Sequence, residues 1–417
     1  MSRSSWMVLW AAFSAGVIAT LVQFSIPPIL SLIKDQYGLS YTDSALLMSL
    51  FALATLLSAV PGGFIVQRHG VRKIGLLGIG IMFIGVLTCL LANSYGVILF
   101  GRIIEGIGFG LVSVAAPSAI GQYVAPRMMS IAMGIWSTWI PVGSLLMFLF
   151  APKLVLNYKS DVYWIFLMIV IALCFLFYAM VIPKQVLVKS RKGADTLETN
   201  TPKLKKEVLL SEIKNKNVWW AALAFASFTF AFFSFNTWIS TYLTETTSMS
   251  LAAASLVPSL VALLTMTSNL FSGILLNKLG NHLYVFLIPP LIFVLAWPFF
   301  TNSSLAVLYG VAAIMGLFSG FMPTIIFASA PLLAKRKETI GIVMSIIIIG
   351  ENTGILIGPE VFGLLREWTG QYTASYWILS IASLLMLVSS LKIWKSGVFK
   401  PKNSSNINIQ DNAASMD

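Results

Sequence analysis

Residues 101–152 read GRIIEGIGFGLVSVAAPSAIGQYVAPRMMSIAMGIWSTWIPVGSLLMFLFAP, two long apolar runs joined by a short polar turn. Each run has the length of roughly 20 residues that a helix needs to cross the hydrocarbon core of a bilayer. Arg102 and Glu105 lie inside the first run, where a charged side chain is costly and seldom without a function. Since the two are three residues apart, we expect them to pair on one face of a helix.

A narrow stripe of residues continues along the same helix face. At about 100° per residue, Arg102, Glu105, Phe109 and Ser113 fall within a sector of about 80°. Glycines border the stripe on both sides and permit close contact with neighbouring helices; they are Gly101, Gly106, Gly108 and Gly110. Such a stripe is typical of a helix beside a water-filled cavity, and we expect a substrate to be handled here.

The composition is that of a membrane protein. Hydrophobic residues make up 58% of the 417 positions and charged residues 10%, whereas soluble domains contain about 25% charged residues. We therefore predict an all-α membrane protein with twelve transmembrane helices. The segments that are long and apolar enough to span a bilayer are 6–33, 42–66, 72–92, 95–123, 129–151, 162–183, 217–243, 251–277, 283–300, 304–332, 339–365 and 372–394.

The basic residues are distributed unequally between the two sides of the membrane. If the amino terminus is cytoplasmic, 22 of the 27 Lys and Arg residues lie on the cytoplasmic side and four on the other. Positive charge gathers in the cytoplasmic segments of membrane proteins. We therefore expect a multi-pass protein of the cell inner (cytoplasmic) membrane with both termini in the cytoplasm. The net charge of +12 follows from this topology, so no nucleic-acid partner is expected.

The spans divide into two similar halves. The predicted domains are two six-helix bundles, 1–183 and 217–394, a cytoplasmic linker, 184–216, and a disordered cytoplasmic tail, 395–417. Gly134, Gly143 and Pro152 have the same spacing as Gly341, Gly350 and Pro359, at an offset of 207 residues. Gln23 matches Asn236, and residues 63–70 match residues 273–280, at similar offsets. Matches in the same order along both halves indicate a duplicated unit with pseudo-symmetric bundles.

Several other classes of protein are disfavoured. We expect no cleavable signal in the first apolar segment, and Cys89 and Cys174 lie inside apolar spans, where we expect buried free thiols. It contains no phosphate-binding glycine loop that ends in Lys-Ser or Lys-Thr and no zinc-ligand spacing. We expect no enzyme, no cofactor and no metal site.

At this point the chain resembles the major facilitator superfamily of secondary transporters over its whole length. Residues 63–73, GFIVQRHGVRK, look like the family's loop motif between the second and third spans, and Arg102 with the glycines after it looks like its fourth-span motif. Within the superfamily, residues 104–106 and 133–143 look like the cyanate-permease-like branch. The resemblance implies two bundles that rock about a central site near mid-membrane.

The resemblance also assigns roles to several residues. It implies that the loop motif gates the movement, through Gly63, Gln67, Arg68, Gly70, Arg72 and Lys73. The family usually has an Asp at the position of Gln67, so the charge network that latches the bundles is expected to be weaker or rearranged. The alternative for the loop is plain cytoplasmic positive charge. The first and seventh spans border the cavity in this fold, which makes Gln23, Asn236 and Trp238 candidate substrate contacts; polar amides in such helices also serve only to hold helices together.

Residues in other spans complete the candidate site. Arg102 suits a carboxylate or small oxyanion, Glu105 is its partner or a proton carrier, and Trp139 is a candidate aromatic contact beside Trp136. Glu351 lies near the middle of the eleventh span, next to the candidate contact Asn352. Loss of water favours the neutral acid, as proton coupling requires. The alternatives are a structural ion pair, a protonated Glu bonded to a neighbouring helix, and aromatic packing.

The function that these residues predict is secondary active transport of a small polar solute, an anion because of Arg102, coupled to protons through Glu351 or Glu105. The partners are then the solute, the coupling ion and the bilayer, and the chain acts as a monomer. Two alternatives stay open: a proton-coupled exporter of drugs or metabolites, and a transporter-like solute sensor. Spans 42–66 and 251–277 lack the Arg that a nitrate-type transporter would be expected to carry, which disfavours that branch.

Overall fold

The computed structural model describes residues 3–124, 128–158, 160–183, 211–279, 283–301, 304–336 and 339–396. The elements of the first half are α1 (Arg3–Gln23), the 3-10 helix η1 (Pro27–Ile29), α2 (Leu30–Tyr37), α3 (Tyr41–His69), α4 (Val71–Leu90), α5 (Tyr95–Tyr123), α6 (Met129–Trp136), α7 (Trp139–Asn157) and α8 (Ser160–Val181). Those of the second half are α10 (Lys216–Thr246), α11 (Leu251–Ala254), α12 (Leu256–Leu279), α13 (Leu283–Ala296), η3 (Trp297–Phe300), α14 (Leu305–Ser319), α15 (Phe321–Leu333), α16 (Ile340–Thr369) and α17 (Tyr372–Lys395).

The predicted all-α fold with twelve spans is confirmed. Twelve helical stretches are long and apolar enough to cross a membrane, and their ends lie close to those predicted from the sequence. No strand occurs among the residues that the structure describes. Most of the predicted linker and of the predicted tail, residues 184–210 and 397–417, lies outside the described residues.

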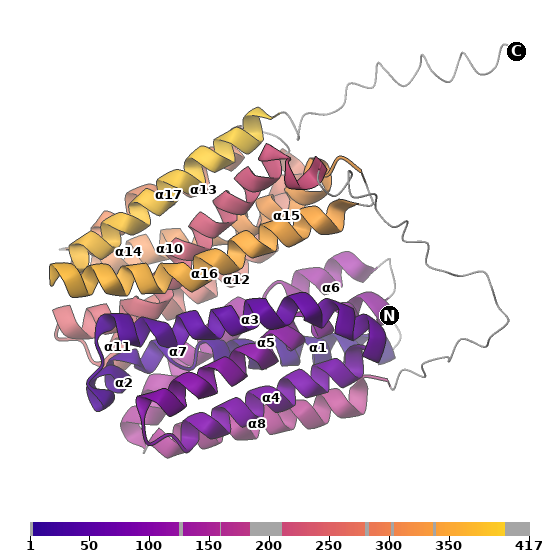
Figure 1. Ribbon diagram of the computed structural model, residues 1–417. Coiled ribbons are helices and arrows are strands. Elements are labelled where there is room, and N and C mark those ends of the chain that lie inside the picture. The colour runs from indigo at the N-terminus through magenta and orange to yellow at the C-terminus, as the bar shows by residue number, and fades with distance from the viewer. Residues whose placement is uncertain are drawn as a thin grey trace, which may run out of the picture.

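The helices of each half lie together (Figure 1). In the first half α5 contacts α1, α3 and α4, and in the second α10 contacts α16 and α17. The most extensive contacts between the halves are those of α3 with α16 and of α7 with α12, and α10 also contacts α2 and η1 of the first half. Figure 1 shows the halves converging toward the end with α2 and α11, called here the α2 end, and diverging toward the end at which the N terminus lies, called the N-terminal end.

Five of the predicted spans are interrupted helices: the first, the fifth, the eighth, the ninth and the tenth. The first stops at Gln23 and resumes as η1, which begins with Pro27 and Pro28, because a proline supplies no backbone N–H to the helical ladder. The fifth is divided between α6 and α7 at residues 137–138, and the tenth between α14 and α15 at Gly320. Ser268 Oγ accepts the backbone N–H of Gly320 at 3.1 Å, which satisfies a donor that the interruption releases.

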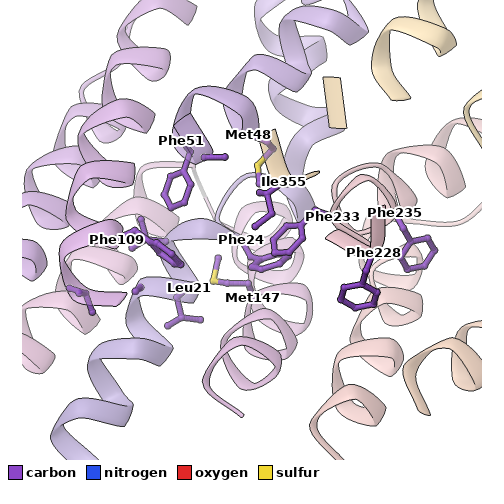
Figure 2. Close-up of a cluster of buried hydrophobic side chains, with 14 of the residues drawn as sticks. Leu21, Phe24, Met48, Phe51, Phe109, Met147, Phe228, Phe233, Phe235 and Ile355 are labelled. Carbon is purple, nitrogen blue, oxygen red and sulfur yellow. The ribbon is translucent and has the colours of Figure 1, made fainter. Parts of the chain in front are cut away.

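Apolar side chains from both halves meet at the centre of the molecule (Figure 2). Phe24, which follows α1, stacks on Phe233 of α10 with ring centroids 5.9 Å apart. The ring of Phe24 also meets that of Phe148 of α7 edge to face. Phe51 of α3 contacts the ring of Phe109 of α5 at 5.3 Å. The two halves therefore share an aromatic contact region at their centre.

Small residues let α16 lie directly on α10. Gly350, Gly354 and Gly358 form one face of α16, and a Cβ on any of them would overlap backbone atoms of α10. Close backbone approach of this kind is a main source of helix association in membranes.

We expect Gly354→Ala to lower the thermal stability of the protein, because the added Cβ would meet Ala226 O and Thr229 Oγ1. Overpacking of this kind costs about 1–3 kcal/mol. The matched control is Gly310→Ala, since a Cβ there would have no other atom within 4 Å. Equal melting temperatures of the two variants in the same detergent would contradict this account of the contact.

Candidate functional site

The predicted pair of Arg102 and Glu105 forms, deep inside the first half. Arg102 Nη1 donates to Glu105 Oε2 at 2.5 Å, and both side chains are completely buried. The guanidinium also lies over the ring of Phe51, 4.4 Å from its centroid. Arg102 is the only Lys or Arg that is buried among the described residues.

Arg102 holds the interruption of the first helix in place. Its Nη1 donates to Val22 O at 2.9 Å and its Nη2 donates to Gln23 O at 3.1 Å, at the point where α1 ends. Its Nε donates to Leu47 O of α3 at 3.0 Å. The last carbonyls of a helix have no partner within the helix, and a basic side chain can satisfy them. In this conformation Arg102 is thus a positioning residue for α1 and α3, with its donors directed at protein acceptors.

Glu105 has a second neighbour, the thiol of Cys89 on α4. Cys89 Sγ lies 3.6 Å from Glu105 Oε1 in hydrogen-bonding geometry. The contact depends on glycine, because a Cβ at Gly85 would meet Glu105 Cγ, and one at Gly101 would meet Cys89 Sγ. Gly101, one of the predicted glycines beside the stripe, and Gly85 of α4 therefore let α4 lie against the carboxylate.

Gln23 contributes to this region with its backbone carbonyl rather than with its amide. The side chain is 4% exposed, and its Oε1 has no hydrogen-bond partner in the structure. Buried polar atoms are nearly always hydrogen-bonded, so an orphaned acceptor calls for an explanation. It makes Gln23 Oε1 an acceptor available to a ligand hydroxyl or to water.

The two candidates on the seventh span lie in different surroundings. Asn236 Nδ2 donates to Phe232 O of its own helix at 2.7 Å. Trp238 is fully buried, donates from Nε1 to Pro359 O of α16 at 3.0 Å, and stacks on Phe362. Trp238 thus joins α10 to α16, and its predicted substrate contact stays a prediction.

The two tryptophans of the fifth span form a stacked pair. The rings of Trp136 and Trp139 are 5.0 Å apart and nearly parallel, and Trp139 is also next to Phe109 of α5. Both indole rings pack on Gly16 of α1, where a Cβ would collide with them. Trp139 is half-buried, so part of its ring can meet a ligand.

The Glu351 carboxylate has no hydrogen-bond partner among the described residues. It is half-buried on α16, and only its backbone carbonyl is engaged, by Thr229 Oγ1 of α10 at 2.8 Å. The next residue, Asn352, is also half-buried and donates to Ile348 O of its own helix. The Glu351 carboxylate and the Asn352 amide can therefore form hydrogen bonds with a ligand or with water.

The predicted gating loop joins α3 to α4. Gly70 connects them with a φ of 86°, a conformation that favours glycine. Arg72 Nη1 donates to Ile182 O at the end of α8, whereas Arg68 and Lys73 are exposed. A Cβ at Gly63 would meet no other atom, and the side chain of Gln67 lies outside the described part of the chain, so the prediction of a weakened latch stays open.

The sequence analysis missed a polar cluster that joins the halves at the α2 end, called here the Glu245 cluster. Glu245 of α10 accepts from Lys34 Nζ at 2.9 Å, from Tyr41 Oη at 2.6 Å and from Tyr372 Oη at 2.8 Å, and Arg366 lies 3.9 Å away. Lys34 and Arg366 are two of the four basic residues predicted outside the cytoplasm. The small number of basic residues on that side was a visible signal that these two have a role. Nothing in the sequence indicated that Lys34 pairs with Glu245, 211 residues away.

Further hydrogen bonds between the halves follow α3 inward from the Glu245 cluster. Thr42 donates to Glu367 from its backbone N–H and its hydroxyl. Ser49 Oγ is 2.8 Å from Leu356 O and 3.1 Å from Glu360 Oε2. Asn269 Nδ2 of α12 donates to Ser137 O, in the break between α6 and α7. The polar contacts between the halves are therefore concentrated along α3 and α16, toward the α2 end.

We expect Glu245→Ala to loosen the α2 end. The variant removes two phenol hydrogen bonds and two ion pairs, each worth about 1 kcal/mol or less at a partly exposed site. The measurement is the alkylation rate of Ser49→Cys, a buried position, in a background with Cys89 and Cys174 replaced by alanine. We expect a clear increase with Glu245→Ala and a smaller one with Glu245→Gln, which keeps the acceptor; unchanged rates in both would show that the cluster does not hold this end closed.

The chain matches the family model described as Major Facilitator Superfamily over residues 12–330 and again over 243–411. A hexuronate transporter of Bacillus subtilis is 21% identical over 419 residues, which cover 96% of this chain and 97% of that protein. A probable chloroplastic anion transporter of Arabidopsis thaliana is 24% identical over 412 residues, which cover 93% of this chain and 78% of the plant protein.

Other matches are shorter or concern the fold alone. An uncharacterised MFS-type transporter of Mycobacterium tuberculosis is 26% identical over 147 residues, 34% of this chain and 25% of that protein. Among solved structures, an inward-facing, unoccupied bacterial homologue of the human lysosomal transporter Spinster superposes with a TM-score of 0.75 at 17% identity, covering 96% of this chain and 98% of the other. The described residues contain no group of three or more metal-ligating side chains.

Proposed function

Since the chain belongs to the major facilitator superfamily of membrane transporters, we propose that it moves a small organic anion across the cytoplasmic membrane by alternating access, coupled to protons. Its relatives are transporters and not enzymes, as predicted. The observation that carries the proposal is Glu351, a carboxylate without a hydrogen-bond partner among the described residues on a helix that touches both halves. The narrower resemblance to the cyanate-permease-like branch stays a prediction.

Alternating access explains the unequal ends of the molecule. The halves are joined by the Glu245 cluster at the α2 end and diverge at the N-terminal end (Figure 1). With both termini in the cytoplasm, this conformation is closed to the outside. The bundles then rock about the central aromatic contact region of Figure 2, and the Glu245 cluster separates when the outer side opens.

Proton coupling is assigned to Glu351 because of where its helix packs. The glycine face of α16 lies on α10 of its own half, while Leu356 on the same helix accepts a hydrogen bond from Ser49 of the other half. A carboxylate that loses water without gaining a donor favours its neutral form. Binding of a proton therefore changes the charge at the interface along which the bundles move.

The anionic substrate is supported by the relatives and by Arg102. The two relatives that match most of this chain are named for hexuronates, which carry a carboxylate, and for anions. Arg102 is the buried cation among the described residues, yet its donors are directed at Val22, Gln23, Leu47 and Glu105 in this conformation. In this conformation Glu105 neutralises Arg102, so a substrate carboxylate reaches the guanidinium only when α1 shifts and Glu105 releases it.

A second candidate, export of a lipophilic solute, is favoured by the aromatic side chains at the centre. The half-buried Trp139 with Phe109 and Trp136 offers flat apolar surface to such a ligand. A lipophilic ligand needs no cation, so its binding would be indifferent to Arg102.

A ligand screen by thermal stabilisation separates these functions. A compound that binds only the folded protein at 100 times its dissociation constant adds about 2.7 kcal/mol of stability. We expect glucuronate or another small carboxylate to stabilise the wild type, and saturable uptake of that compound into proteoliposomes under an inward proton gradient. Stabilisation by lipophilic compounds alone would support the exporter, and binding without saturable flux would support a solute sensor.

A further inference from the structure

A pocket of about 480 Å³ lies at the α2 end inside the first half, apart from the contact between the halves. It is bounded by α2, by the turn between α4 and α5, and by the start of α8. Four hydrophilic side chains line it: Gln36, Asn93, Ser160 and Asp161. Since a water molecule takes up about 30 Å³ in the liquid, this space admits several waters and offers them polar partners.

The inner wall of this pocket touches the buried ion pair by two routes. Cys89 lines the pocket and lies 3.6 Å from Glu105 Oε1. Tyr163 lines it as well and donates to Ser25 O at 2.6 Å, and the hydroxyl of Ser25 accepts from Arg102 Nη1 at 3.1 Å. One layer of side chains therefore separates the pocket from both members of the pair.

Among the helices packed around Glu105, those that face the pocket carry the polar side chains. On its own helix the charged neighbour is Arg102, on α4 the neighbour is the neutral thiol of Cys89, and on α8 the titratable neighbour is Tyr163. From α1 and α3 the pair meets backbone carbonyls and apolar side chains among the described residues. The short path from Glu105 to an aqueous space thus passes Cys89.

We propose that this pocket is a separate aqueous access through which protons reach Glu105 without passing between the two halves. The Cys89 thiol gives its proton to Glu105 Oε1 and receives one from a hydronium ion in the pocket. The hydronium becomes water, the carboxylate becomes the neutral acid, and the thiol is unchanged. The inference deepens the proposed function, because it rests on proton coupling and gives the proton an outer entrance that stays open while the Glu245 cluster is closed.

The test is infrared spectroscopy of the full chain in lipid nanodiscs during exchange from H2O to D2O, with no substrate present. The carboxylic C=O band that disappears in Glu105→Gln belongs to Glu105, and the one that disappears in Glu351→Gln belongs to Glu351. Ala92→Trp fills the pocket from the α4–α5 turn, and Gln36→Trp fills it from α2 on the opposite wall. Cys89→Val removes the relay with a side chain slightly larger than the thiol, so that no space for a replacement water is left.

We expect each of these three variants to slow deuteration of the Glu105 band by about tenfold or more, because exchange then depends on local opening. The Glu351 band, the internal control, exchanges as in the wild type. An unchanged Glu105 rate in the folded variants would overturn the proposal, and so would the absence of a Glu105 band at every pH. Either failure leaves the transport proposal standing, since that proposal is tested by uptake.

Discussion

Arg102→Ala is expected to lower the free energy of unfolding by about 3–5 kcal/mol, the cost of breaking a buried ion pair, and to abolish transport. The loss exceeds that of an ordinary surface ion pair because three backbone carbonyls lose a donor at once, those of Val22, Gln23 and Leu47. Thermal unfolding in detergent and uptake into proteoliposomes measure the two effects.

A double variant separates the two roles of Arg102. Replacing both members of a buried ion pair by apolar side chains often leaves the stability of a protein unchanged. The double variant Arg102→Met, Glu105→Leu would therefore be as stable as the wild type if Arg102 and Glu105 bonded only to each other. We expect the double variant to stay destabilised, because the carbonyl of Gln23 remains without a donor and that of Val22 keeps only the backbone N–H of Ser25. Full recovery would show that Arg102 does not hold the interruption of the first helix, and wild-type uptake in Arg102→Ala would remove it from the transport mechanism.

Glu351→Gln is expected to abolish accumulation driven by a pH gradient while leaving exchange of labelled for unlabelled substrate intact. One pH unit is worth about 1.36 kcal/mol for one proton, so the wild type with one proton per substrate would accumulate about tenfold across that gradient. The glutamine keeps the size and polarity of the side chain and cannot change charge, so the variant would only equilibrate its substrate.

Glu360→Gln is the matched control, since Glu360 is a half-buried carboxylate on the same helix that accepts from Ser49 Oγ. We expect it to retain accumulation driven by the pH gradient. If Glu351→Gln accumulates substrate like the wild type, Glu351 is not the proton carrier. If both variants fail in exchange as well as in accumulation, the carboxylates of α16 serve binding or folding instead.

The fold was predictable because membrane spans are local features of a sequence. Length and apolar composition located the twelve spans, and repeated glycine and proline spacings indicated the two halves. The interruption of the first helix at residues 23–27 was missed, although Pro27 and Pro28 were a visible signal. A hydropathy window does not respond to a short change of helix geometry inside an apolar run.

The candidate site was predictable only where its contacts are local. The spacing of three residues placed Glu105 beside Arg102, and the structure agrees. The remaining partners of Arg102 lie 55 to 80 residues away, at Leu47 and Val22, and those of Glu245 lie in both halves. Contacts at such separations depend on the packing of several helices, which no single segment of the sequence specifies.

The first helices of the two halves differ mechanically. The first helix of the first half is interrupted, whereas its counterpart α10 is continuous from Lys216 to Thr246. The arginine that stabilises the interruption also lacks a counterpart, because no Lys or Arg occurs between Leu305 and Leu333. In this chain the interruption and the arginine depend on each other, because loss of either alone would leave buried donors or acceptors without partners. A chimera of two first halves would carry two fixed bends, so the repeats are no longer interchangeable modules.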